Sequence, residues 1–176
     1  MTYDLNSKPN PSEYNTADTL FYTPIKRRCP GCETQIADYF NHLGEVIVTE
    51  THQTVRQKWA ATSFNKALPG SPHDCKPDIM LSTPNVDIHH WCQVDCVAET
   101  SALVQPSTKI QKTTIMKAFC MFTEQPTHCY IINIWMVGMK FCVAYFNHSG
   151  QVITTFPYTE CHTFMHLITG LMFSSD

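Results

Sequence analysis

Two kinds of apolar pattern alternate along this chain of 176 residues. In the first, apolar residues recur at intervals of three or four, which is the spacing of a helix that buries one face. In the second, short apolar runs lie between turn residues such as Pro and Gly, which is typical of buried strands. The two kinds follow one another as helix, strands, helix, strands, helix. This order predicts an α/β fold in which a mixed central sheet is flanked by helices.

The residues between these patterns set the expected boundaries. A helix at 108–123 ends before Pro126, which cannot continue it, and Gly44 weakens the case for an unbroken first helix. Residues 1–24 are rich in Asn, Ser, Thr and Pro and are expected to form a flexible arm, whereas residues 25–176 are expected to form one domain. The expected helices are 33–49, 108–123 and 160–173, and the expected strands are 54–63, 79–81, 91–98, 129–137, 140–146 and 152–156.

The composition excludes several classes of protein. Hydrophobic residues make up 43% of the chain, so it is not fully disordered. The richest apolar stretch, 130–145, is interrupted by Asn133, Gly138 and Lys140, so no run of about 18 apolar residues could span a membrane. A net charge of −3 disfavours strong nonspecific affinity for nucleic acid. With nine cysteines and no visible signal peptide, we expect an intracellular protein of the cytoplasm or nucleus, with reduced thiols and no membrane partner.

Two acidic residues flank two of the expected strands. Asp78 comes directly before the run at 79–81, and Glu99 directly follows the run at 91–98. If these strands pair, both carboxylates emerge at one edge of the sheet. Oxygen ligands of this kind suit Mg²⁺, which can activate water for attack on a phosphodiester. Solvated loop acids are common at the same places, so spacing alone leaves both interpretations open.

Several segments around these acids occur together in a characteristic order. They are Leu68-Pro69-Gly70-Ser71, Lys76-Pro77-Asp78-Ile79-Met80-Leu81, Trp91 ahead of a strand followed by Glu99, the helix from Phe119 to Gln125-Pro126, Phe146-Asn147-His148-Ser149-Gly150, and 164–171. This set resembles the N-terminal region of the fungal-type protein kinase family, over roughly residues 59–173. In that family the region precedes the kinase lobes and is similar to the PD-(D/E)XK restriction-endonuclease fold. The resemblance implies such a sheet, with Asp78 and Glu99 as its Mg²⁺-binding acids.

The chain departs from a working nuclease two residues after Glu99. A PD-(D/E)XK nuclease carries Lys there, which helps to activate the attacking water and offsets charge in the transition state. This chain has Ser101, whose hydroxyl group carries no charge. For catalysis beside Asp78 and Glu99, Lys109 or Lys112 of the following helix would have to replace the missing lysine.

Kinase chemistry is not supported either. The chain has six glycines without a cluster, and no His-Arg-Asp or Asp-Phe-Gly string. The resemblance therefore implies a truncated, noncatalytic member of the family, a pseudoenzyme that acts by binding a protein or a nucleic-acid backbone and requires no cofactor. The alternative is a Mg²⁺-dependent PD-(D/E)XK nuclease with a migrated lysine.

A pair of cysteines, Cys29 and Cys32, offers a different site. Two thiolates at this spacing can bind Zn²⁺, and a zinc-stabilised interaction module is the third hypothesis. The same spacing occurs in redox sites, but a loop rather than a strand precedes Cys29. Unliganded thiols remain the simplest interpretation, because no second pair is evident. The candidates for that pair are His73 with Cys75, or members of the group His89, His90, Cys92 and Cys96.

Overall fold

The computed structural model describes residues 32–61, 67–70, 74–84, 90–101, 108–138 and 140–174. The expected arm at 1–24 lies outside these residues. The helices are α2 (Cys32–Thr51), α3 (Thr108–Glu124) and α4 (Cys161–Phe173), with short 3₁₀ helices at Trp91–Gln93 and Tyr158–Glu160. The strands are β1 (Lys58–Ala60), β2 (Ile79–Ser82), β3 (Cys96–Ser101), β4 (Tyr130–Val137), β5 (Lys140–Asn147) and β6 (Gly150–Pro157).

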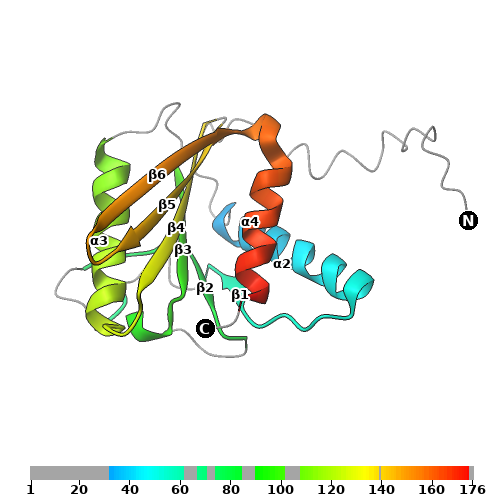
Figure 1. The fold of residues 1–176 in the computed structure, drawn as a ribbon, viewed down its shortest axis with the longest axis horizontal. Helices are drawn as coiled ribbons and strands as arrows, with labels where there is room; N and C mark the ends of the chain where they lie inside the picture. Colours follow the sequence, from blue (N-terminus) through cyan, green and yellow to red (C-terminus); the bar gives the residue numbers. More distant parts are fainter. Residues whose placement is uncertain are drawn as a thin grey trace, which may run out of the picture.

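The strands form one mixed sheet that lies between two layers of helix. Their order in the sheet is β1-β2-β3-β4-β5-β6, the same as their order in the sequence. Figure 1 shows α3 on one face of this sheet and α2 with α4 on the other. The prediction of a mixed central sheet flanked by helices is therefore confirmed. None of the described helices is both long enough and apolar enough to cross a membrane.

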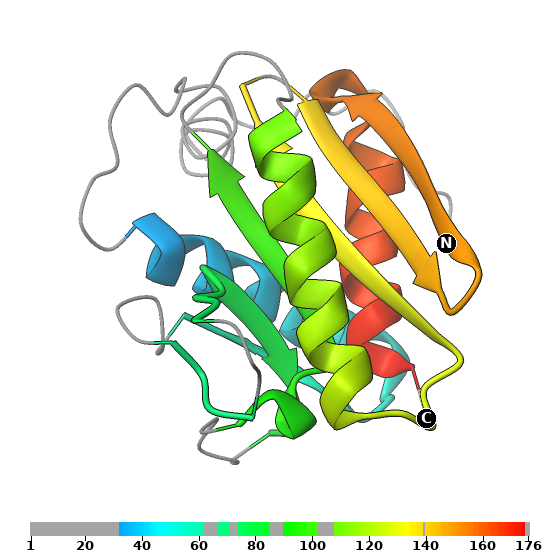
Figure 2. The same ribbon diagram turned by 90° about the vertical axis from the view of Figure 1, so that its left-hand side faces the viewer.

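One pair of neighbouring strands, β3 and β4, is parallel, and the other pairs are antiparallel. Parallel neighbours need a crossover connection, because the chain must return to the starting edge of the sheet. The helix α3 lies between β3 and β4 in the sequence and packs along the sheet (Figure 2). The first turn of α3 consequently lies toward the edge at which β3 ends.

The two faces of the sheet have separate hydrophobic cores. Successive residues of a strand point to opposite faces, so β4 contributes Ile134 and Met136 to the core under α2 and α4. The same strand contributes Ile131 and Trp135 to the core under α3. Because helices cover both faces, β4 is apolar along nearly all of its length rather than at alternate positions. The exception is Asn133, which is fully buried.

The segment 91–98 differs from the sequence prediction. Its first part, Trp91–Gln93, is a 3₁₀ helix, and β3 begins only at Cys96. The side-chain amide of Gln125 donates hydrogen bonds to the carbonyl oxygens of Trp91 (2.9 Å) and Val94 (2.8 Å). These bonds satisfy backbone groups that would otherwise need a neighbouring strand. Similarly, the described part of the expected strand at 54–63 forms a strand only over β1.

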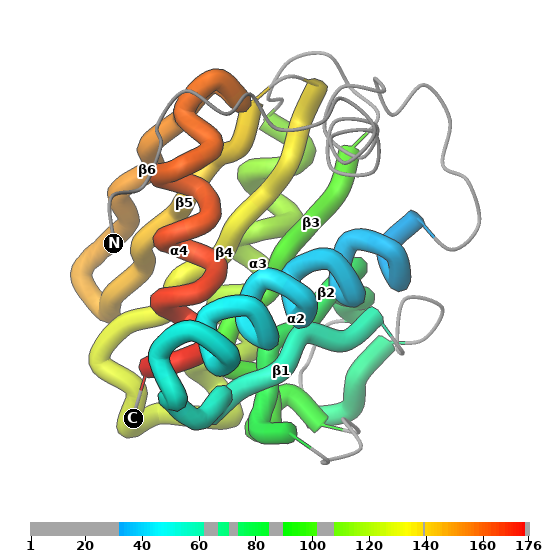
Figure 3. The backbone as a smooth tube through the Cα atoms, turned by 90° about the vertical axis from the view of Figure 1, so that its right-hand side faces the viewer, coloured from blue at the N-terminus to red at the C-terminus, as the bar shows by residue number. Residues whose placement is uncertain are grey.

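The helix α2 runs through Gly44 without a break, although sequence analysis expected a weak point there. Figure 3 shows α2 and α4 on the same face of the sheet. A Cβ atom added at Gly44 would overlap the terminal methyl group of Met172 from α4, and would lie 3.1 Å from its sulfur atom. The absence of a side chain at Gly44 thus leaves room for the end of the Met172 side chain between the two helices.

We predict opposite effects for the same substitution at two helical glycines. Gly44→Leu should lower the free energy of unfolding by about 1–3 kcal/mol, because it overfills the contact with Met172. Gly170→Leu should raise it by up to about 1 kcal/mol, because leucine favours the helix and the space beside Gly170 is open. Urea unfolding of both variants tests this, and equal effects at the two positions would contradict it.

Candidate active site

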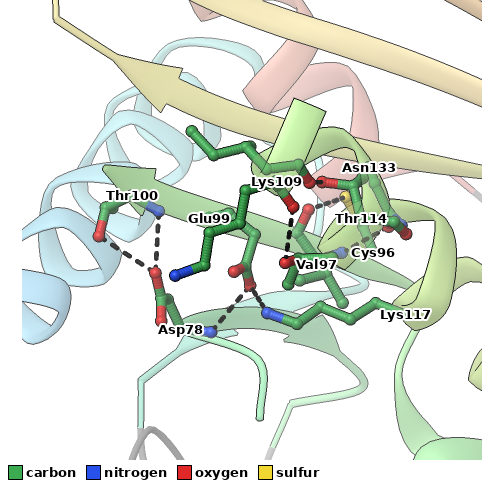
Figure 4. A network of polar contacts seen from close by, with 11 residues as sticks. Asp78, Cys96, Val97, Glu99, Thr100, Lys109, Thr114, Lys117 and Asn133 are labelled. Carbon is green, nitrogen blue, oxygen red and sulfur yellow. Dashed lines mark hydrogen bonds and ion pairs between the residues drawn. The ribbon is translucent and has the colours of Figure 1, made fainter. Parts of the chain in front are cut away.

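The pairing of β2 with β3 brings the two predicted acids together. Ile79 lies directly opposite Ala98 in this antiparallel pair, so Asp78, just before β2, lies beside Glu99. The backbone N–H of Asp78 donates a hydrogen bond of 3.1 Å to Oε1 of Glu99. Both side chains thus lie at the edge where β2 begins and β3 ends (Figure 4).

The Asp78 carboxylate is held by the residue that follows Glu99. Oδ2 of Asp78 accepts hydrogen bonds from the backbone N–H of Thr100 (3.0 Å) and from its hydroxyl group (3.2 Å). Two donors on one oxygen fix the orientation of the carboxylate. The Asp78 residue is half-buried.

A lysine that the sequence analysis did not name lies against Glu99. Nζ of Lys117, in α3, forms an ion pair with Oε1 of Glu99. The side chain of Lys117 is 1% exposed and that of Glu99 is 12% exposed, and lysine is rarely buried this deeply without a partner. The signal was present in the sequence: position 117 follows Ile110 and Thr114 at helical spacing, on the buried face of α3.

The residues that the sequence analysis proposed for catalysis lie on the two elements that carry this pair, β3 and α3. Ser101 is half-buried at the end of β3, while Lys109 and Lys112 are exposed on α3. Figure 4 shows the side chain of Lys109 extending from the first turn of α3 toward the two acids. That Lys109 or Lys112 completes a catalytic site stays a prediction, and the lysine that forms an ion pair with Glu99 is Lys117 of the same helix.

The surroundings of Glu99 favour its protonated form. Burial raises the pKa of Glu99 above its ordinary value, and the nearby negative charge of Asp78 raises it further. The Lys117 ammonium group and the N–H of Asp78 oppose this shift but do not cancel it. A bound divalent cation would favour the ionised carboxylate in the same way as Lys117 does.

The residues present fit a magnesium ion that is bound by a few carboxylates, rather than a metal whose ligands all come from the protein. Mg²⁺ is usually held by one or two carboxylates and keeps several waters, and Asp78 with Glu99 supplies two. Among the described residues, no group of three or more His, Cys, Asp or Glu could hold a metal ion. A metal at this site would therefore complete its coordination with water or with substrate oxygens.

The second predicted site is only partly described. Cys29 lies outside the described residues, as do the possible partners His73 and His89. Cys32 begins α2 and packs, half-buried, against the core under α2 and α4. Cys96 is fully buried in β3, where burial raises the pKa of its thiol well above the usual range. The zinc hypothesis remains a prediction.

No protein-family model matches this chain, and no match exists among curated proteins or solved structures. What the chain does must therefore be inferred from the side chains themselves.

We predict that Lys117→Met destabilises the protein in a pH-dependent way. Removal of the ammonium group leaves a buried carboxylate without its partner, which costs about 3–5 kcal/mol at pH 8. The substitution also raises the pKa of Glu99 further, so the folded state holds that proton more tightly than the unfolded state. Stability of the variant should thus fall as pH rises from the ordinary value of 4.5 through the raised pKa.

Lys112→Met is the matched control for this prediction. It removes the same charge from an exposed position of the same helix and should change stability by less than about 0.5 kcal/mol. Guanidinium unfolding of both variants and the wild type at pH 5 and pH 8 gives the comparison. If Lys117→Met lowers the free energy of unfolding equally at both pH values, the expected role of the Glu99 charge is contradicted.

Proposed function

We propose that this chain is a metal-dependent phosphodiesterase of the PD-(D/E)XK type that cleaves nucleic acid. Asp78 and Glu99 would hold the divalent cation, and Lys117 would serve as the catalytic lysine. One observation carries the proposal: Lys117 forms an ion pair with Glu99. The sequence-based argument for a noncatalytic protein depended in part on Ser101, and a lysine supplied from α3 would answer that part of the argument.

The arrangement of elements around the site supports this proposal. The acids come from antiparallel neighbours, β2 and β3, and the lysine comes from the helix that crosses over to the parallel strand β4. Two paired strands and a helix therefore position the three functional groups, with Asp78 directly before β2. Sites built on helices and strands keep their geometry better than sites on loops, and hydrolysis of a phosphodiester needs such fixed geometry.

The chemistry of the three groups fits hydrolysis. A divalent cation, when bound, would lower the pKa of a water molecule and offset the negative charge that develops on the phosphate. The ammonium group of Lys117 has three N–H donors, so beside Glu99 it would retain donors for an attacking water or a phosphate oxygen that reaches this buried site. Water would attack phosphorus as the ester P–O bond breaks. The water oxygen would stay on phosphorus, and one proton of that water would end on the leaving oxygen, which departs as an alcohol.

One observation favours a second candidate, which is a noncatalytic module of the fungal-type kinase family that binds a protein or a nucleic-acid backbone. Oε1 of Glu99 already interacts with Lys117 and with the N–H of Asp78. Burial also raises the pKa of this carboxyl, which opposes metal binding because a metal needs the ionised form. In this reading the three residues stabilise the fold and the binding surface lies elsewhere.

A nicking assay on plasmid DNA, with parallel single-stranded DNA and RNA substrates, separates the two candidates. With Mg²⁺ or Mn²⁺ present, the wild type should cleave at least one substrate. Asp78→Ala, Glu99→Ala and Lys117→Met should each lower the rate by about 10²–10³-fold, as for the loss of a group that stabilises transition-state charge. Lys112→Met should cleave as the wild type does.

Two outcomes would count against the proposal. Cleavage that survives in the three site variants would come from another site or from a contaminant. A wild type that is folded and binds Mn²⁺, yet cleaves none of the substrates, would favour the noncatalytic module.

A further inference from the structure

Asn133 is a polar residue in the middle of the most apolar strand. It is 0% exposed, and its neighbours in β4 are apolar on both faces of the sheet. A buried amide without hydrogen bonds would cost about 1–3 kcal/mol, so its partners explain why it can be there. Those partners lie on the two elements that carry Glu99 and Lys117.

The first partner belongs to β3. Oδ1 of Asn133 accepts a hydrogen bond of 3.2 Å from the backbone N–H of Val97, which lies directly opposite in the parallel pair. Val97 precedes Glu99 by two residues, and residues two apart in a strand point to the same face. The amide of Asn133 is thus anchored to the strand that carries Glu99, on the face covered by α3.

The second partner belongs to α3. Nδ2 of Asn133 donates a hydrogen bond of 3.5 Å to the backbone carbonyl oxygen of Thr114. Thr114 precedes Lys117 by three residues, which is close to one helical turn. Its own hydroxyl group is occupied within the helix, because it donates to the carbonyl oxygen of Ile110 (2.9 Å). Figure 4 draws the bonds of Asn133 to Val97 and Thr114 in one view with the pair of Glu99 and Lys117.

We propose that Asn133 is a positioning residue: its amide sets the position of α3 along β3 so that Lys117 meets Glu99. Apolar side chains between a helix and a sheet tolerate small shifts along the helix axis, whereas the directed hydrogen bonds of Asn133 to Val97 and Thr114 restrict such shifts. The catalytic importance of this bridge rests on the proposed function, but the bridge itself does not.

The chain provides a matched control on the other face of the sheet. Asn41 of α2 is also buried, and its amide also joins a helix to a strand. Its Nδ2 donates to the carbonyl oxygen of Trp59 and its Oδ1 accepts from the N–H of Trp59, both at 2.9 Å. Asn41 therefore resembles Asn133 in burial and in the number of bonds, but it lies in the layer opposite α3.

The test follows the ammonium group of Lys117 by NMR in protein labelled with ¹⁵N-lysine and free of added metal. A buried, paired ammonium group exchanges its protons slowly, so we expect one protected signal in the wild type that disappears in Lys117→Met. Asn133→Leu should abolish or strongly broaden this signal, whereas Asn41→Leu should keep it. Asn133→Thr is a second variant in case the leucine variant does not fold. Threonine suits a strand but cannot reach both partners, so this variant should lose the signal as well.

The outcomes separate this proposal from the proposed function. An unchanged ammonium signal in either folded Asn133 variant, or equal loss of the signal in Asn41→Leu, would overturn the positioning role. If the signal depends on Asn133 but the wild type cleaves no nucleic acid, the positioning role stands and the nuclease proposal fails. If the wild type cleaves, Asn133→Leu should lower the rate at least tenfold relative to Asn41→Leu.

Discussion

The buried ion pair of Lys117 with Glu99 is the interaction on which the rest of the site depends. Removal of two charges from water costs several kcal/mol per ion, and attraction between them compensates only with good geometry and further hydrogen bonds. The N–H of Asp78 supplies one such bond to Glu99. The ion pair thus joins α3 to the sheet, and the groups proposed for catalysis also hold the layers together.

Buried amides recur on both sides of the sheet. Asn41 connects α2 to β1 through the backbone of Trp59, and Asn133 connects β4 to β3 and to α3. The apolar cores supply most of the driving force for packing, but they are less selective about the position of a helix along a strand. Directed hydrogen bonds restrict the position of a helix along a strand. The bond of Asn133 to Thr114 does so about one helical turn from Lys117.

Much of the fold could be predicted from sequence because periodicity reports which faces are buried. The helices and the strand runs were recognised in this way, and the meeting of Asp78 with Glu99 followed from the pairing of neighbouring strands. The prediction for 91–98 was wrong at its start because a large apolar residue such as Trp91 is buried equally well in a strand or a 3₁₀ turn. The hydrogen bonds that favour the 3₁₀ turn come from Gln125, which lies 31 to 34 residues away in the sequence.

The site was predicted less completely for a related reason. Lys109 and Lys112 lie nearest to Glu99 in the sequence, but helical geometry places a later residue over it. Lys117 could have been found by its position on the buried stripe of α3, where a lysine needs an acidic partner. Asn133 was visible as an interruption of an apolar run, yet its bonds to β3 and α3 could not be read without the register of the strands.

The central claim is that Lys117 performs the task of a lysine located two residues after Glu99. Glu99 and Ser101 point to the same face of β3, so Ser101→Lys would return an ammonium group to that location. The most direct measurement is the rate of metal-dependent DNA cleavage by the double variant Ser101→Lys, Lys117→Met, compared with that of Lys117→Met alone. Recovery of at least tenfold is the predicted result. A double variant that is folded and binds Mn²⁺, but cleaves no faster than the single variant, would contradict the claim.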